Sequence, residues 1–359
     1  MSWLPQNLRR SLAFLAVVAS AVTSSAPAQS ACNADLDRDG TIGCADLAQV
    51  LSAWGPCAGC EPDLTGDSVV DSHDLSTLLG GWGATCASDT WYTVIECAPN
   101  PSVVTNAALR NAIVATGLPW RVRDKVSQID MLLVPPGTFS MGCSASAQWA
   151  CYPDELPVHT VTLTTPYYIG RFEVTQSQWT AIMGSNPSAF QGPAYPGAGN
   201  QPVERVSWNM VQGFLKATGL RLPTEAEWEF ACRAGTTTAF HGWAANPNGT
   251  NIDSQVVSIA WFASNSANRP RPVGGKPANG LGLYDMHGNV FEWTSDWWSE
   301  TYYASSPSMN PTGPATGVWR VFRGGSWLNL TNGLRSSARY AWEPFELDSI
   351  IGFRVARNP

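Results

Sequence analysis

The sequence predicts a loop-rich α+β domain that follows a small helical module. Glycine and proline number 32 and 26 among 359 residues, which predicts many turns, while charged residues make up only 14% of the chain. After residue 129, strand-like runs alternate with short helix signals. Before residue 87, two acidic stretches are each followed by a helical pattern. We therefore expect two modules of unequal size.

The N-terminus has the features of an export signal, for which we expect residues 1–28. Arg9 and Arg10 supply positive charge, residues 11–22 are apolar but too short to span a bilayer, and Ala26-Pro27-Ala28 suits cleavage. No later segment reaches the length of a membrane span. We expect an exported protein, secreted or held at the cell surface. Its net charge of -7 offers no basic surface for nucleic acid.

Cysteine usage agrees with export, because disulfides form in oxidising compartments. Six of the nine cysteines lie before residue 98 and predict a disulfide framework whose connectivity stays open. The spacing of Cys57 and Cys60 also fits a redox or zinc pair, although a disulfide suits an exported module better. Cys143 and Cys151 can close a loop. Cys232 is then left over, and we expect it to be buried.

The first acidic stretch has the spacing of a calcium loop. Oxygen ligands are expected at positions 1, 3, 5, 7 and 12, and a glycine, here Gly40, gives the sharp turn at position 6. The predicted ligands are Asp35, Asp37, Asp39, Thr41 and Asp46. Thr41 would contribute its carbonyl oxygen, and the shorter aspartate stands at position 12 where glutamate is usual.

The same spacing returns in a second stretch, where Ser68 replaces the glycine of position 6. The predicted ligands are Asp63, Thr65, Asp67, Val69 and Asp74. Each stretch is followed by a short predicted helix, over residues 47–54 and 75–82. The alternative is a pair of acidic surface loops, but the matching Leu-rich, Trp-Gly endings favour an internal duplication.

Residues 32–86 thus resemble the dockerin family, which pairs two calcium loops with one helix each. The resemblance implies bound calcium and a docking partner, either a cohesin-like protein or another cell-surface component. The chain departs from the family at loop positions 10 and 11, which are Cys44-Ala45 in the first repeat and Ser72-His73 in the second.

Residues 87–128 are expected to connect the modules, with a short helix over residues 106–116. Three capping signals, at Thr175, Ser207 and Thr224, predict helices in the large domain. Predicted strands there occupy residues 131–142 (two strands and a turn), 160–164, 167–174, 320–327 and 352–355.

Residues 282–298 combine dense aromatics, carboxylates and a Gly288-Asn289 turn pair that tolerates positive φ. Such a turn can aim side chains and carbonyls at one point, and an all-oxygen pocket suits calcium. The predicted ligands are Asp285, Gly288, Val290 and Glu292. The alternative is an aromatic core strand flanked by ordinary surface acids.

Residues 129–357 resemble the formylglycine-generating enzyme family, also called the sulfatase-modifying factor domain. The matching runs are Met141-Gly142, Pro157 to His159, Phe172 to Thr175, Pro202-Val203, Val206 to Trp208, Arg221 to Phe230, Gly282 to Trp293, Arg323 to Trp327 and Gly352 to Arg354. The resemblance implies an α/β, loop-rich fold related to C-type lectins. It also implies the calcium site on Asp285, Gly288, Val290 and Glu292.

The family's reaction, as the resemblance describes it, uses two cysteines a few residues beyond the Gly-Gly-Ser run to bind copper and oxidise a substrate cysteine. Copper(I) needs soft thiolates. The chain has no cysteine after Cys232, and residues 328–340 offer amides, hydroxyls and guanidiniums instead. We therefore expect no copper and assign no catalytic residue. The four histidines also lack the clustering that iron-dependent relatives need.

A binding or scaffold role for a glycan or a protein is the function we predict. The alternative is formylglycine generation, or another activity of the family, by an altered mechanism. Aromatic residues in or near loops suit stacking on sugars, although we favour the alternative that they fill the core. They are Trp261, Trp297, Trp298, Tyr302, Tyr303, Trp319, Trp327 and Trp342.

Overall fold

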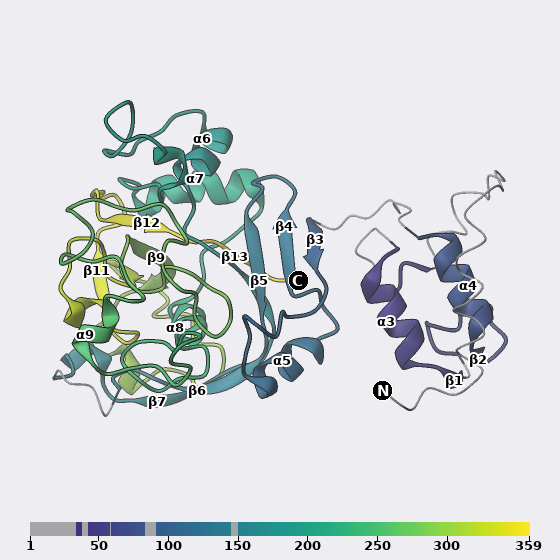
Figure 1. The fold of residues 1–359 in the computed structure, drawn as a ribbon. Coiled ribbons are helices and arrows are strands. Elements are labelled where there is room, and N and C mark those ends of the chain that lie inside the picture. Colours follow the sequence, from purple (N-terminus) through teal and green to yellow (C-terminus); the bar gives the residue numbers. More distant parts are fainter. Residues whose placement is uncertain (1–33, 38–41, 58, 83–90, 145–149) are drawn as a thin grey trace. The chain divides into compact units, whose positions relative to one another are not determined.

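The computed structural model describes residues 34–37, 42–57, 59–82, 91–144 and 150–359. The chain divides into two units, Met1–Asp89 and Thr90–Pro359 (Figure 1). The predicted export signal lies outside the described residues, as do Asp39 and Thr41. In the described ranges, no helix combines the length and apolar character that crossing a membrane requires.

The first unit is built from two helices and a short antiparallel strand pair. These are α3 Cys44–Ser52, β1 Gly55–Pro56, β2 Val69–Val70 and α4 Ser72–Gly80. Its small core includes Ile42 and Val50 from the first repeat and Val70 and Leu78 from the second. A disulfide joins Cys57 to Cys60, so the pair serves as a covalent staple, as expected.

A five-stranded antiparallel sheet starts the large unit, with the strand order β13-β8-β5-β4-β3. The strands are β3 Tyr92–Glu96, β4 Arg121–Asp124, β5 Asp130–Val134, β8 Tyr167–Gly170 and β13 Ala356–Arg357. Strands β3 and β4 and helix α5 Ala107–Val114 come from the segment expected to connect the modules. That segment therefore contributes to the sheet, and its predicted short helix is confirmed.

The charges of β4 explain why its sequence did not predict a strand. Arg121 donates to Glu96 at 2.7 Å and to Asp130 at 2.6 Å, so its charge is neutralised by the strands on both sides. Arg123 donates to the same Asp130 at 2.7 Å. Between the arginines, Val122 points into the core and is fully buried. The strand thus satisfies its charges through cross-strand pairs.

A second sheet has four strands in the order β11-β10-β9-β12, in which β12 runs parallel to β9. Its strands are β9 Phe291–Trp297, β10 Arg320–Arg323, β11 Tyr340–Trp342 and β12 Ile351–Phe353. A separate hairpin pairs β6 Gly137–Met141 with β7 His159–Leu163. Long loops join these elements, so the predicted loop-rich character is confirmed (Figure 1).

Three helices of the large unit begin where their caps predict: α6 Gln176–Met183, α7 Trp208–Thr218 and α8 Glu225–Arg233. The single-turn α9 Asp253–Val256 has no side-chain cap and was not predicted. The hydroxyls of Thr175, Ser207 and Thr224 each accept a backbone N–H from the first turn. Gly184 and Gly219 end α6 and α7 in the left-handed conformation. Helix α8 instead ends at Ala234, which adopts φ 46° one residue before the expected glycine.

Large aromatic side chains fill much of the core. Trp179 stacks on Phe214 with ring centroids 5.6 Å apart, and Phe353 meets both rings edge-on. Trp228 and Trp293 are fully buried. Of the loop aromatics singled out above, Tyr303 and Trp327 are buried and Trp319 is 40% exposed. Filling the core therefore accounts for many of the aromatic residues.

Four buried arginines bind carboxylates that lie far away in the sequence. Arg323 joins Glu225 and Glu229 of α8, and Arg339 donates to Glu225 at 2.7 and 2.9 Å. A second set of pairs links Arg335 to Glu155 and Arg354 to Glu292. All of these side chains are enclosed by protein. Breaking such a pair from one side costs about 3–5 kcal/mol, because it leaves a buried charge uncompensated.

Two buried acids predict a pH-dependent stability. Burial raises the pKa of Glu204 to about 7, and burial together with Glu225 raises the pKa of Asp296 to about 7. The folded protein thus keeps protons that the unfolded chain releases between about pH 4 and pH 7. Its stability falls as the pH rises through this window.

We expect the melting temperature to be higher at pH 5 than at pH 8, and Glu204→Gln to reduce this difference by raising the value at pH 8. Glutamine keeps the Oε1 that accepts the N–H of Phe190. The exposed Glu300→Gln is the matched control and should leave the profile unchanged. Equal melting temperatures at both pH values in the wild-type protein would contradict the assignment.

Candidate functional sites

The two acidic loops of the first unit share one hydrogen-bond pattern. In the first loop, Asp46 accepts the backbone N–H groups of Asp37 at 3.2 Å and Gly43 at 2.7 Å. In the second loop, Asp74 accepts those of Thr65 at 2.9 Å and Asp71 at 2.8 Å. These donors occupy corresponding positions of the two repeats. The aspartate at position 12 therefore closes each loop in the same way.

The first loop forms a candidate metal site. Asp35, Asp37 and Asp46 each offer a carboxylate oxygen, and these atoms lie within 4.8 Å of one another. Three carboxylates this close repel one another unless a cation neutralises them. The cluster can hold a metal ion, and its all-oxygen chemistry is that of a hard cation.

The second loop is arranged differently. The carboxylate of Asp63 accepts three backbone N–H groups of its own turn. The donors are Gly66, Asp67 and Ser68, at 2.7, 3.1 and 2.8 Å. Ser68 adopts φ 71°, in the left-handed region where the first loop has a glycine. In the described part of the chain, this loop does not bring three carboxylate oxygens within 4.8 Å of one another as the first one does. Calcium at Asp63, Thr65, Asp67, Val69 and Asp74 stays a prediction.

The predicted calcium turn of the large unit is buried. Asp285 accepts the N–H of Gly274 at 2.6 Å, and burial raises the pKa of its carboxyl group to about 6. Both oxygens of Glu292 accept from Arg354, and one also accepts from Trp228 at 2.6 Å. Two of the predicted ligands, Asp285 and Glu292, therefore lie in one buried region close to the guanidinium of Arg354.

Sequence reasoning missed a third acid in this region. Glu173 accepts the N–H of Val290 at 3.0 Å and the Nδ2 group of Asn289 at 2.6 Å. Burial and the nearby Asp285 raise the pKa of Glu173 well above its usual range. The available signal was an acid placed between Phe172 and Val174 in an apolar run.

Three buried carboxyl groups lie around one arginine. Burial and the neighbouring acids raise the pKa of two of them, because ionising all three would leave an excess of negative charge. A cation bound among them would balance that charge. The carbonyl groups of Gly288 and Val290 belong to the same turn and are of the right chemical type. The oxygens of Glu292 are already shared with Arg354 and Trp228. The residues present therefore fit a cation by charge, while calcium on Asp285, Gly288, Val290 and Glu292 stays a prediction.

The window of residues 328–340, where the family's copper cysteines are expected, is held by internal contacts. Asn329 accepts from the backbone N–H of Ser326 at 3.0 Å and from its hydroxyl at 2.6 Å. Leu334 is fully buried in a small apolar cluster. Arg335 and Arg339 form the ion pairs with Glu155 and Glu225 described above. The window thus serves the fold.

The free thiol of Cys232, which by its chemistry could bind copper, is also buried. In the described ranges Cys232 is the one free cysteine, and burial raises the pKa of its thiol to about 12. Its Sγ lies 3.9 Å from Nε2 of His287, which in turn accepts the N–H of His241 at 3.0 Å. Cys143 and Cys151 form a disulfide, as predicted. No thiol pair is therefore available in this part of the chain.

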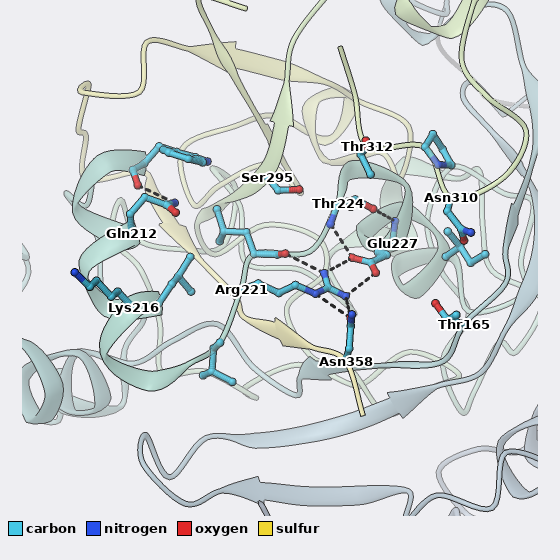
Figure 2. A pocket seen from close by; sticks show the side chains of 16 residues that line it. Thr165, Gln212, Lys216, Arg221, Thr224, Glu227, Ser295, Asn310, Thr312 and Asn358 are labelled. Atoms are coloured by element: carbon cyan, nitrogen blue, oxygen red, sulfur yellow. Dashed lines mark hydrogen bonds and ion pairs between the residues drawn. The ribbon is translucent and has the colours of Figure 1, made fainter. Parts of the chain in front are cut away.

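Figure 2 shows a pocket of about 580 Å³ between α7, the start of α8 and the C-terminal end of the chain. Arg221 crosses it and donates to both oxygens of Glu227, at 2.6 and 2.7 Å, and to Asn358 at 2.7 Å (Figure 2). Glu227 also accepts the N–H of Thr224 at 2.8 Å. The Arg221–Glu227 pair therefore holds the start of α8 in place. Leucines and Trp208 form much of the rest of the pocket wall.

Removing metal should loosen the first unit, because its clustered carboxylates then repel one another. A chelator is expected to increase protease cleavage within residues 34–82 and to reduce the helical circular dichroism of that unit. Calcium at a hundredfold excess over its Kd would restore about 2.7 kcal/mol of stability.

Asp35→Asn, which removes one charge of the cluster at constant size, should weaken this response, and Glu61→Gln in the same unit is the control. A chelator that leaves both cleavage and circular dichroism unchanged in the wild-type protein would rule out the metal-dependent order.

Comparison with known proteins identifies the family of the large unit. Residues 104–359 match the sulfatase-modifying factor enzyme 1-like domain family. The formylglycine-generating enzyme of Streptomyces coelicolor is 33% identical over 280 residues, which cover 63% of this chain and 88% of that protein. The serine/threonine-protein kinase pkn1 of Chlamydia caviae is 33% identical over 251 residues, 64% of this chain, but the chain spans only 38% of that relative.

Two solved structures share the fold. Treponema denticola variable protein 1 is 30% identical with a TM-score of 0.57, covering 64% of this chain and 95% of that one. PvdO from Pseudomonas aeruginosa is 30% identical with a TM-score of 0.56, covering 67% of this chain and 98% of that one. From Val104 to its C-terminus, the chain belongs to the sulfatase-modifying factor family.

Proposed function

We propose that the chain is an exported, calcium-stabilised binding protein whose large unit keeps the family fold without the cysteine-oxidising reaction. The observation that carries this proposal is the state of residues 328–340. They contain no thiol, and their arginines are committed to buried ion pairs with Glu155 and Glu225. The function that we propose for the large unit is recognition of a glycan or a protein.

The chemistry of copper argues in the same direction. Copper(I) is stabilised by soft thiolates, and amides, hydroxyls and guanidiniums do not replace them. Two carboxylates that contact the window, Glu155 and Glu225, are already paired with Arg335 and Arg339 and so are not free to bind a metal ion. Cys232 is protonated at neutral pH because its pKa is about 12. It therefore supplies neither a ligand pair nor a reactive thiolate.

The first unit would attach the protein to a partner. The proposal rests on the resemblance of residues 32–86 to dockerins. It also rests on the hydrogen-bond pattern that Asp46 and Asp74 share. The acidic cluster of Asp35, Asp37 and Asp46 would take calcium. A cohesin-like protein or another cell-surface component is the partner that this arrangement would suit, and such a partner agrees with the proposed export of the protein.

The competing function is an enzyme that acts by an altered mechanism, favoured by the 33% identity to a formylglycine-generating enzyme. The two are separated by incubating the protein with a sulfatase peptide that bears the target cysteine, together with copper and oxygen. Mass spectrometry should show the peptide unchanged, while the Streptomyces coelicolor enzyme converts it in a parallel reaction. Conversion of the cysteine to an aldehyde by this chain would overturn the binding function.

A further inference from the structure

A second pocket of the large unit, of about 720 Å³, has a wall without formal charge. Three segments far apart in the sequence form it: residues 102–106, 234–248 and 277–284. The residues that line it are aromatic, amide, hydroxyl, small apolar, proline or glycine residues. Such a wall offers no counter-charge to a phosphate, a carboxylate or an ammonium group, and burying an unpaired charge is costly. The occupant it suits is polar and neutral.

Two aromatic rings stand at this pocket, and both are held in place. Trp243 is half-buried and packs against the apolar cluster of Phe240 and its neighbours. The ring of Tyr284 lies 5.0 Å from that of Phe172, and the guanidinium of Arg171 lies 5.2 Å from its centre. Fixed rings lose little conformational entropy when they contact a ligand. They offer apolar surface beside polar groups, which matches the mixed character of a sugar ring.

The polar groups of the wall both donate and accept hydrogen bonds. Asn248, Thr237 and Ser102 are exposed and line the pocket. Asn106 uses its Oδ1 to accept the N–H of Leu109 at 3.1 Å, which leaves its amide N–H groups to other partners. Amides and hydroxyls complement ligand hydroxyls, which themselves do both. A saccharide presents this pattern on every ring.

The base of the pocket is preformed. Asn279 donates to the carbonyls of Ala231 and Cys232 at 2.8 and 3.1 Å, and its Oδ1 accepts from the loop that follows. Gly242 lies so close to Pro247 that an added Cβ would fall 2.2 Å from a carbonyl oxygen. The loop can therefore close only with glycine there. A preformed site avoids the cost of ordering loops upon binding.

We propose that this pocket binds a neutral saccharide, through stacking on Trp243, contact with Tyr284 and hydrogen bonds from the amides and hydroxyls around them. The inference rests on the proposed binding function and gives it a place and a ligand class. No carboxylate lines the pocket. The wall therefore offers no carboxylate through which a calcium ion could bridge the protein and the sugar hydroxyls.

The test is an array of neutral and acidic oligosaccharides, followed by titration of the strongest neutral binder. Ala244→Trp would fill the pocket, whereas Ala245→Trp places the same bulk on the neighbouring exposed residue that does not line it. Ala244→Trp should weaken binding at least tenfold, and Ala245→Trp should leave it unchanged. Binding should persist in a chelator under conditions in which near-ultraviolet circular dichroism shows the large unit folded.

Several results would overturn the site: no neutral oligosaccharide bound, binding only to acidic ones, equal loss in both tryptophan variants, or loss of binding in the chelator while the unit stays folded. These failures are distinct from failure of the binding function itself, which is marked by aldehyde formation on the sulfatase peptide. If Ala244→Trp bound a neutral glycan as tightly as the wild-type protein, the binding function would stand. The glycan would then bind at a place other than this pocket.

Discussion

Buried arginine–carboxylate pairs hold the large unit together. Its strands are short and its loops long, so these pairs add fixed connections to those that the apolar core provides in the second half of the chain. Arg323, Arg335 and Arg339 bind acids from α8 and from residues 153–155, and Arg354 binds Glu292 of β9. Each guanidinium thereby ties a C-terminal segment to a distant element. Removing one partner would leave a buried charge, which is among the costliest changes a core can suffer.

The position of these pairs links the fold to the proposed function. Arg335 and Arg339 lie in residues 328–340, where the family's reaction would need thiols. Their buried ion pairs with Glu155 and Glu225 give this window a structural role. The proposed binding function assigns recognition to this unit, and the charge-free pocket around Trp243 and Tyr284 is the place that we propose for it. The buried acids Glu173, Asp285 and Glu292 lie together beside the neighbouring turn, and a bound calcium ion would balance the charge that they carry when ionised.

The sequence predicted the elements that local rules control. Caps at Thr175, Ser207 and Thr224 located three helices, and the Cys143–Cys151 disulfide and buried Cys232 followed from counting cysteines. It did not predict β3 and β4, because their charges are satisfied only by pairing across the sheet. Glu173 was missed because an acid in an apolar run gains meaning only from its buried partners. The saccharide pocket depends on three segments that meet only in the folded chain.

The most direct test of this account is a double-mutant cycle on Arg335 and Glu155, followed by urea unfolding. This pair joins the window to a segment 180 residues away. If the pair is structural, Arg335→Gln and Glu155→Gln should each lower the free energy of unfolding by about 3–5 kcal/mol, and the double variant should cost little more than either alone. Small or strictly additive losses would show that the window is not held by this pair, and would contradict the account.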